Sequence, residues 1–280
     1  MADSFIFSPE GSGTLTEGAR RKVLVTGAGG NIGLDFARRN RNRYELRLMV
    51  REQEFPSELR TAGQVVQGDL SDADTLQHLC DGIDTVLHLA ASASPDETWE
   101  PLLQNNIVGT YNLFTAAHAA RCRRVVFASS IHAISGYPPA RQVHADDPPN
   151  PGDLYGVSKC FGEAMGRYMA VQRGLSVIVV RIGAFQPLTT AQDPATVGLI
   201  DGYISYGDMN DLLQRCIDDE RLRFAIVHGL SNNAFNRMDI TETMELLGYS
   251  PRDDFAAHNP RLKDLRLHER MTHSDKDKTA

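Results

Sequence analysis

The chain has 280 residues, of which 41% are hydrophobic and 23% are charged, and its formal net charge is −7. This length and composition are ordinary for a globular protein and allow one large α/β domain or a domain with a small lobe. The negative charge argues against a nucleic-acid or membrane-surface partner, and no apolar run approaches the length of a membrane span.

The first twenty residues surround a short apolar Phe5-Ile6-Phe7 and lack the basic start and long apolar core of a signal peptide. We expect residues 1–20 to be a disordered extension. The cysteines have neither paired nor metal-like spacing, which favours a cytoplasmic location and predicts no metal site. They are Cys80, Cys122, Cys160 and Cys216.

A β-branched run over residues 22–26 leads directly into a glycine-rich turn and then into a helical pattern. This order is the context that a dinucleotide-binding fingerprint requires. Gly27 would allow the tight turn, Gly30 the close approach of a pyrophosphate, and Gly33 the packing of helix on strand. A glycine turn without a ligand is the alternative. The predicted cofactor-binding residues of this segment are Gly27, Gly30, Asn31, Ile32 and Gly33.

A second strand over residues 46–50 ends where nucleotide-binding folds place an acid against the adenosine ribose. Arg51 follows it here. Because an arginine can pair with a 2′-phosphate, NADP is at least as compatible with this end as NAD. Glu52 is adjacent, so a solvated Arg51 without a ligand is the alternative.

The third and fourth strands are predicted over residues 65–70 and 85–91. Asp69 could accept a hydrogen bond from the adenine amino group. The fourth strand is nearly all apolar, as expected for a parallel sheet covered on both faces, and we interpret His88 within it as a core residue. The predicted cofactor contacts here are Asp69, Leu70, Leu89, Ala90 and Ala91.

A long helix is predicted over residues 99–121, and a fifth strand over residues 125–128 delivers Ser129, Ser130 and His132. The proline-rich segment between Ser130 and Tyr155 is too long for a simple connection, which indicates a binding loop.

Tyr155 and Lys159 stand four residues apart on a predicted helix that ends near Gly174. Side chains at this spacing share one helical face, so the ammonium would favour the phenolate and lower the pKa of the tyrosine toward neutrality. Such a phenolate can act as a general base. For an isolated match, a surface helix with an unrelated tyrosine and lysine is the alternative.

Beyond Gly183 the alternation of strand and helix weakens. A sixth strand over residues 177–181 precedes this point, and beyond it we predict a loop over 186–202, a helix over 208–216 and a last strand over 224–227. Asp239 and Glu242 form a capping-box pattern for a helix that stops at Gly248. The predicted fold is a Rossmann-like, doubly wound parallel α/β sheet over residues 21–183, a small C-terminal substrate-binding lobe over 184–267 that returns to the sheet, and a disordered tail over 268–280.

The order Gly27-x-x-Gly30-x-x-Gly33, Ser130 and Tyr155-x-x-x-Lys159 resembles the extended short-chain dehydrogenase/reductase (NAD-dependent epimerase/dehydratase) superfamily. Three further segments are similar to the uronate dehydrogenase branch and its sugar-oxidising relatives, namely residues 127–132, 154–163 and 180–183. The match covers residues 22–254. It implies NADP or NAD as the cofactor and a small-molecule carbohydrate as the substrate.

The resemblance implies a Tyr155 base assisted by Lys159, with Ser130 bonded to the reacting hydroxyl and Asn106 bracing the proton relay. Lys159 would also hold the nicotinamide ribose. Proton loss to Tyr155 and hydride transfer to the nicotinamide would oxidise a sugar at its anomeric carbon to a lactone. The implied substrate-binding residues are Ser92, Ser130, His132 and Tyr155.

Three features depart from the uronate pattern. Ile131 stands where the uronate enzymes have an asparagine, Ala184 stands where they have a serine, and no arginine or lysine occurs in residues 182–214 to grip a carboxylate. A two-pronged carboxylate contact is not readily replaced, so neutral or phosphorylated aldoses are alternative substrates. Further candidate contacts are Arg141 and Arg237, for a phosphate, and Asn232 and Asn233.

Two alternative functions remain open. One is a sugar-nucleotide epimerase or dehydratase of the same superfamily, although those enzymes usually carry a larger lobe after the position of Gly183. The other is a cofactor-sensing protein without turnover, although such proteins typically lose the tyrosine or the lysine. The superfamily also suggests a homo-oligomer formed through the long helices.

Overall fold

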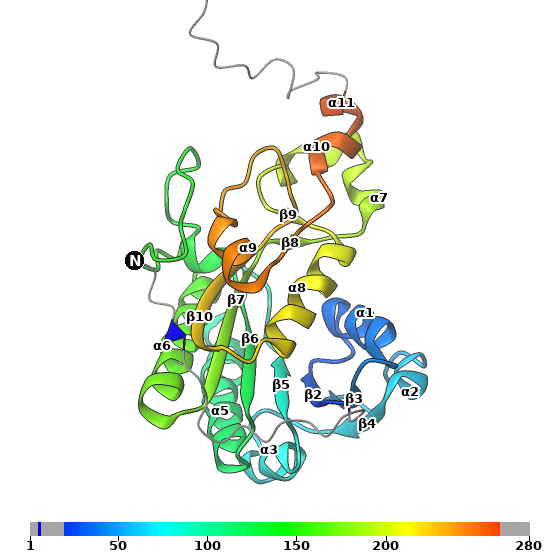
Figure 1. Cartoon of the computed structure of the whole chain (residues 1–280), viewed down its shortest axis with the longest axis vertical. Helices are drawn as coiled ribbons and strands as arrows, with labels where there is room; N and C mark the ends of the chain where they lie inside the picture. Colours follow the sequence, from blue (N-terminus) through cyan, green and yellow to red (C-terminus); the bar gives the residue numbers. More distant parts are fainter. Residues whose placement is uncertain (1–4, 7–19, 264–280) are drawn as a thin grey trace, which may run out of the picture.

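The computed structural model describes residues 5–6 and 20–263, and the sheet at its centre organises everything else. The strands of this sheet are β1 (Phe5–Ile6), β2 (Lys22–Thr26), β3 (Glu45–Val50), β4 (Gln64–Gln67), β5 (Thr85–His88), β6 (Arg124–Ser130), β7 (Ser176–Ile182) and β10 (Leu222–Gly229). Their order is β1-β10-β7-β6-β5-β2-β3-β4 (Figure 1). Every pairing is parallel except that of β1 with β10.

Helices cover both faces of the sheet, which confirms the predicted Rossmann-like fold class. One face is covered by α1 (Asn31–Asn40), α2 (Leu59–Ala62) and α8 (Tyr206–Asp218), and the other by α3 (Ala73–Cys80), α5 (Gly109–Ala119) and α6 (Leu154–Arg173). Successive side chains of a strand point to opposite faces. Val23 and Val25 therefore pack into the first core and Leu24 into the second.

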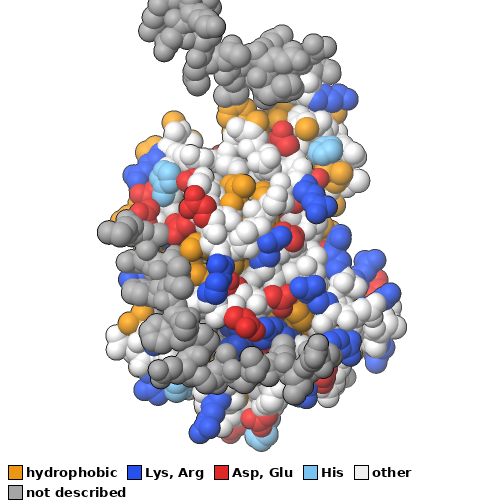
Figure 2. All heavy atoms as spheres, viewed as in Figure 1, with side chains coloured by type: hydrophobic (Ala, Val, Ile, Leu, Met, Phe, Trp, Pro, Cys, Tyr) orange, Lys and Arg blue, Asp and Glu red, His pale blue; other side chains and the backbone are white. Residues whose placement is uncertain are grey.

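Two residues of the predicted N-terminal extension, those of β1, pair with the edge strand β10. Residues 1–4 and 7–19 of that extension and the predicted tail lie outside the described residues. Within the described part, no helix is long and apolar enough to span a bilayer. Acidic and basic side chains are interspersed on the described surface seen in Figure 2.

The order of the strands reverses next to β2, and this reversal places the site. The chain runs outward from β2 through β3 to β4 and then returns to β5 on the other side of β2. Thr26 holds the two strand ends together, because its Oγ1 accepts from the N–H groups of Leu89 and Ala90 at 3.2 Å each. A crevice for a ligand is expected at such a switch point.

The predicted helix over residues 99–121 is helical over nearly all of that range, but its middle is a π-helix. It consists of α4 (Trp99–Pro101), the π-helix η1 (Leu102–Val108) and α5. A π-helix has wider turns than an α-helix and often marks a functional site. The wider turn changes which side chains face the sheet, and a 3.6-residue periodicity cannot anticipate this.

The C-terminal lobe lies above the carboxyl ends of the strands (Figure 1). Its elements are β8 (Ala184–Phe185), α7 (Leu188–Ala191), the 3-10 helix η3 (Pro194–Leu199), β9 (Tyr203–Ile204), α9 (Thr241–Leu247), α10 (Phe255–His258) and α11 (Pro260–Lys263). The prediction of a loop over residues 186–202 was wrong. Asp193 caps η3 by accepting from the N–H of Ala195 at 2.8 Å, and Pro194 starts it, so a short helix forms there.

The predicted capping box at α9 was also wrong. The residue at the N-cap is Ile240, and the carboxylate of Asp239 accepts instead from the N–H of Thr241 at 3.0 Å and from its hydroxyl at 2.7 Å. This places Glu242 one position too early to complete the box. The predicted stop is confirmed, because Gly248 has the left-handed φ of +62° that ends many helices.

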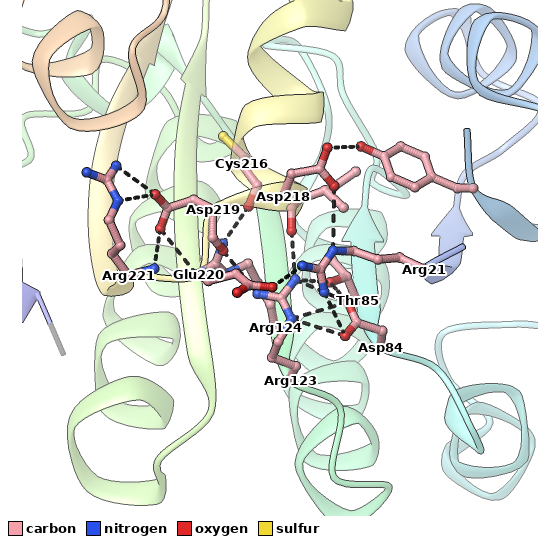
Figure 3. Close-up of polar contacts among 12 residues, drawn as sticks. Arg21, Asp84, Thr85, Arg123, Arg124, Cys216, Asp218, Asp219, Glu220 and Arg221 are labelled. Carbon is pink, nitrogen blue, oxygen red and sulfur yellow. Dashed lines mark hydrogen bonds and ion pairs between the residues drawn. The ribbon is translucent and has the colours of Figure 1, made fainter. Parts of the chain in front are cut away.

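A cluster of ion pairs secures the opposite end of the sheet (Figure 3). Arg123 pairs with Asp84 at 3.1 Å and donates to the carbonyl of Ile217 at 2.6 Å. Arg124 is almost fully buried and donates to the carbonyl of Cys216 at 2.8 Å and to that of Leu222 at 2.7 Å. These arginines tie the end of α8 to the sheet, far from the carboxyl ends where the crevice lies.

Candidate active site

The glycine turn joins β2 to α1 at the crevice. Gly27 has a φ of +67°, and a Cβ there would lie 2.8 Å from the backbone nitrogen of Ala90. A Cβ at Gly33 would collide with the carbonyl oxygen of Gly27. Both positions therefore require glycine for the turn to pack between the two strands and the helix.

The N-terminus of α1 opens directly onto this turn. The N-cap residue, Gly30, has no side chain to cap the helix, and the first turn of the helix contains no acidic residue. The first N–H groups of the helix and the positive end of its dipole are therefore available to an anion. This is the arrangement that holds a phosphate at a helix N-terminus, so the residues present fit a pyrophosphate.

A cavity of about 830 Å³ runs along the carboxyl ends of the strands from the glycine turn to α6. The predicted cofactor-binding residues all line it, namely Gly27, Gly30, Asn31, Ile32, Gly33, Arg51, Asp69, Leu70, Leu89, Ala90, Ala91, Tyr155 and Lys159. The predicted substrate-binding residues line it as well, namely Ser92, Ser130, His132 and Tyr155. The fold thus gathers residues from six separate segments into one cavity.

Arg51 and Asp69 lie at the end of this cavity formed by β3 and β4. Arg51 is exposed, and its Nε donates to Glu52 at 2.9 Å. Asp69 accepts from the N–H and the hydroxyl of Ser71, each at 2.8 Å, and these hydrogen bonds lower the pKa of the Asp69 carboxyl. The end of the cavity therefore presents the exposed guanidinium of Arg51 beside a carboxylate that stays ionised.

Helix α6 approaches the end of β6 closely because two of its residues are glycines. A Cβ at Gly156 would collide with the carbonyl oxygen of His132, and a Cβ at Gly162 would collide with the ring of Phe127. This approach buries Tyr155 and Lys159 to 8% and 4% exposure. The pair faces the cavity and not the solvent, so the reading of an ordinary surface helix does not hold.

Lys159 is held by the backbone of β6. Its Nζ donates to the carbonyl oxygen of Ala128 at 2.9 Å and lies 5.4 Å from the centre of the Tyr155 ring. Burial lowers the pKa of Lys159 to about 8. The lysine therefore loses its proton before an ordinary phenol would lose one.

The expected lowering of the tyrosine pKa does not occur in the protein alone. Burial raises the pKa of Tyr155, and a hydrogen bond with Ser130 only partly opposes this effect. With a pKa of about 8, Lys159 is still largely protonated at neutral pH, but burial of the phenol outweighs the groups that favour its ionisation. A positive charge bound close to the phenol would shift its pKa back down.

The π-helix η1 directs two successive asparagines toward Ser92. Asn105 lines the cavity and donates to the Ser92 hydroxyl at 2.9 Å. Asn106 is buried, accepts from the N–H of Ser92 at 2.8 Å, and donates to its carbonyl and to the hydroxyl of Ser158 at 2.9 Å each. Asn106 therefore braces the loop and does not line the cavity, whereas Asn105, which the sequence did not single out, lies in it.

His132 lies beside Tyr155 at the substrate end. The two rings meet edge to face with their centres 5.4 Å apart, and Nδ1 of the histidine is 2.6 Å from Oδ2 of Asp153. The Ser130 hydroxyl accepts from the backbone N–H of His132 at 3.2 Å. Ser130, His132 and Tyr155 thus lie next to one another and line the cavity with polar groups.

The rest of the substrate end is apolar or aromatic. Ile131, Ala184 and Phe185 line it, and Phe185 is stacked on Tyr206 with ring centres 4.2 Å apart and planes 7° apart. Among the described lining residues, Arg51 and Lys159 are the only arginine or lysine. The loop residues that sequence reasoning considered do not line the cavity, namely Arg141, Arg237, Asn232 and Asn233.

Three of those four residues have other contacts within the protein. Arg141 pairs with Asp147 at 2.5 Å and lies over the ring of Tyr137, and Arg237 donates to the carbonyl of Tyr137 at 2.6 Å. Asn233 is buried and donates to the carbonyl of Tyr203 at 2.9 Å. These contacts hold the proline-rich loop against the lobe. They give the polar residues a structural role, which the sequence alone could not distinguish from contact with a ligand.

The protein is a dinucleotide-binding protein of the Rossmann class. This class is defined here by the parallel doubly wound sheet, the glycine turn at its switch point and the buried tyrosine–lysine pair in the same cavity. A model of the NAD dependent epimerase/dehydratase family matches residues 23–186. The chain belongs to this NAD-dependent family. The predicted superfamily and the predicted nicotinamide cofactor are confirmed at that level.

Curated relatives cover most of the chain. An NAD-dependent glucose-6-phosphate dehydrogenase from Haloferax volcanii is 33% identical and aligns over 84% of this chain and 94% of its own. An L-arabinose 1-dehydrogenase (NAD(P)(+)) from the same organism is also 33% identical, over 84% of this chain and 98% of its own. The crystal structure of uronate dehydrogenase from Agrobacterium tumefaciens matches with a TM-score of 0.77 and 32% identity, over 93% of this chain and 92% of the other.

Proposed function

We propose that this protein is an NAD(P)-dependent dehydrogenase that oxidises a sugar or sugar acid at its anomeric carbon to a lactone. The observation that carries the proposal is the placement of Tyr155, Lys159 and Ser130 in the same cavity as the glycine turn. The sugar dehydrogenases among the relatives support the reaction class. A cytoplasmic location is part of the proposal, and the free state of the four cysteines supports it.

The glycine turn and the N-terminus of α1 would hold the pyrophosphate of the cofactor, and Asp69 would accept from the adenine amino group. Arg51 would pair with a 2′-phosphate, since it can leave the exposed Glu52 at little cost. Lys159 would hold the nicotinamide ribose. When bound, an oxidised nicotinamide would bring one positive charge to the site and accept the hydride.

Tyr155 is the proposed base that takes the proton of the anomeric hydroxyl, and Ser130 is the proposed hydrogen-bond partner of that hydroxyl. Tyr155 and Ser130 are 8% and 7% exposed, so both contacts would form largely away from solvent, which strengthens them. Asn106 would act only by fixing Ser92 and α6, because its amide is engaged by Ser92 and Ser158.

The substrate determinants differ from those of a uronate site. Ile131 and Ala184 offer no hydrogen bond to a carboxylate, and within the described lining no arginine lies near Tyr155. The stacked ring of Phe185 offers an apolar surface to the C–H face of a sugar. A neutral aldose fits this end better than a hexuronate or a sugar phosphate.

The test is to incubate the protein with NAD or NADP and a panel of aldoses, uronates and aldose phosphates while reduced cofactor is followed by absorbance. We expect turnover with a neutral aldose, a lactone product, and loss of at least a thousandfold in kcat for Tyr155→Phe with cofactor binding retained. Cofactor binding without turnover of any sugar would refute the proposal and favour a sensor. Epimerisation of a nucleotide sugar without net reduction would favour the epimerase alternative.

The same proposal includes a homodimer formed through α5 and α6. Exposed apolar side chains follow one stripe of α6, and the adjacent α5 carries a further exposed aromatic residue, Tyr111. The residues of the stripe are Leu154, Val157, Tyr168 and Val171. Their spacing is that of a helix face that packs on a partner.

Sedimentation would test the dimer. The wild type is expected at twice the 30.9 kDa of the chain, and Tyr168→Glu is expected as a monomer. Met244→Glu is the matched control, because Met244 is also an exposed apolar residue but lies on α9. A wild-type monomer at micromolar concentration would rule the dimer out.

A further inference from the structure

Asp153 uses its two carboxylate oxygens for two different contacts at the start of α6. Oδ1 accepts from the N–H of Gly156 at 2.7 Å and caps the helix. Oδ2 lies 2.6 Å from Nδ1 of His132. One carboxylate therefore links the helix that carries Tyr155 to the histidine at the substrate end of the cavity.

This contact decides which nitrogen of the His132 ring carries hydrogen. An ionised carboxylate only accepts hydrogen bonds, so Nδ1 must donate to it. In the neutral ring the lone pair is then on Nε2. Within residues 5–6 and 20–263, the structure gives Nε2 no hydrogen-bond partner, and the ring lines the cavity with its side chain 32% exposed.

We infer that Asp153 is a positioning residue, which holds His132 in the Nδ1–H tautomer so that Nε2 accepts a hydrogen bond from a hydroxyl group of the sugar. The inference rests on the proposed function and adds a determinant of substrate choice to it. A lone pair at Nε2 matches a sugar hydroxyl and is repelled by a carboxylate. His132 belongs to a segment that is similar to the uronate branch, so this contact recognises a sugar hydroxyl, while Ile131 and Ala184 carry the departures from the uronate pattern.

Asp153→Asn separates the two contacts of the carboxylate. Asparagine caps helices about as well as aspartate, so its amide oxygen can keep the bond to Gly156. Its NH₂ group would then face Nδ1 and donate to it, which forces the hydrogen of the ring onto Nε2. The variant should reverse the polarity of Nε2 while the start of α6 stays in place.

We expect Asp153→Asn to lower kcat/KM for the sugar by about tenfold to a hundredfold, mainly through KM, because a buried hydroxyl loses its acceptor. The dissociation constant of the cofactor and the melting temperature should change little. Asp72→Asn is the matched control, since Asp72 caps α3 through the N–H of Thr75 at 3.0 Å and, within the described residues, hydrogen-bonds to no histidine ring. This control should leave kcat/KM unchanged.

A double-mutant cycle with His132→Ala distinguishes positioning from capping. If Asp153 acts through His132, Asp153→Asn should cause no further loss in the His132→Ala background. Additive losses, or wild-type kcat/KM in Asp153→Asn, would overturn the inference. The cycle needs an active wild type, so the absence of any sugar turnover would count against the proposed function alone.

A second readout is independent of activity. Nitrogen-15 chemical shifts of the His132 ring in the ligand-free protein should report Nδ1–H in the wild type and Nε2–H in Asp153→Asn. An Nε2–H tautomer in the wild type would overturn the inference even if the enzyme oxidises a neutral sugar.

Discussion

Replacing Lys159 by methionine should make the ligand-free protein more stable while it abolishes activity. Lys159 is 4% exposed, and burial lowers its pKa from 10.5 to about 8. This lowering corresponds to a cost of about 3 kcal/mol for keeping the ammonium in the folded protein. Methionine has a similar length and no charge, so Lys159→Met removes this cost.

The gain is reduced by one lost hydrogen bond. The carbonyl of Ala128, which accepts from Nζ at 2.9 Å, would be left without this donor, at a cost of about 1 kcal/mol. The net stabilisation at pH 7 is then about 2 kcal/mol, which raises the melting temperature of a chain of this size by about 4 to 8 °C. Such a gain would identify Lys159 as a residue kept for function at the expense of stability.

The pH dependence of the gain provides the decisive measurement. The folded-state pKa of Lys159 lies below its unfolded value, so the ammonium penalty is complete below pH 8 and disappears as the pH rises toward 10.5. Urea denaturation should therefore show that Lys159→Met has a higher free energy of unfolding than the wild type at pH 7, and that this gap between the two proteins closes at pH 10. Lys22→Met, at a lysine with 51% side-chain exposure, is the control and should show no gap. A Lys159→Met protein that is less stable than wild type at pH 7, or a gap that persists at pH 10, would refute the reasoning.

Three further changes have defined outcomes. Gly33→Ala should lower the free energy of unfolding by about 2 kcal/mol and abolish cofactor binding in calorimetric titration, because its Cβ would meet the backbone of Gly27. Gly198→Ala is the control and should do neither, because a Cβ there meets nothing within 4 Å. Arg51→Ala should weaken NADP binding about tenfold and leave NAD binding within twofold, and equal losses for both would exclude the 2′-phosphate contact. Burial and the nearby charge of Lys159 lower the pKa of His88 to about 3. Burial and the nearby charge of Arg181 lower the pKa of His228 to about 4. Because the unfolded chain then binds more protons, the free energy of unfolding should fall by about 2 kcal/mol from pH 6.5 to pH 5.5, and a constant urea midpoint over this range would contradict the assignment.

The sheet could be predicted from the sequence because its signals are local. The buried strands are continuous apolar runs, and the glycines of the first turn stand between a strand and a helix at fixed spacing. His88 was correctly interpreted as a core residue, since its Nδ1 lies 2.8 Å from the buried hydroxyl of Thr26. Errors of one to three residues at the ends of strands do not affect the side chains that reach the cavity.

The parts of the site that the sequence missed depend on contacts between distant segments. Asn105 reaches the cavity because η1 is a π-helix, and no periodicity of the sequence reveals a wider turn. The raised pKa of Tyr155 depends on how closely α6 packs on β6, whereas the sequence shows only the spacing to Lys159. The arginines of the loop and the lobe could be judged only after their partners were known.

The position of Tyr155 depends on a third buried residue of the same helix face. Glu163 follows Lys159 by one turn and accepts from Nε and Nη2 of Arg181 at 3.0 and 2.9 Å. The same carboxylate accepts from the hydroxyl of Ser129 at 2.6 Å, and Ser129 directly precedes Ser130. Because removal of one partner leaves a buried charge unpaired, a rotation of α6 that breaks this contact is costly. Glu163 thus joins the helix that carries the proposed base to the end of the strand that carries the proposed serine.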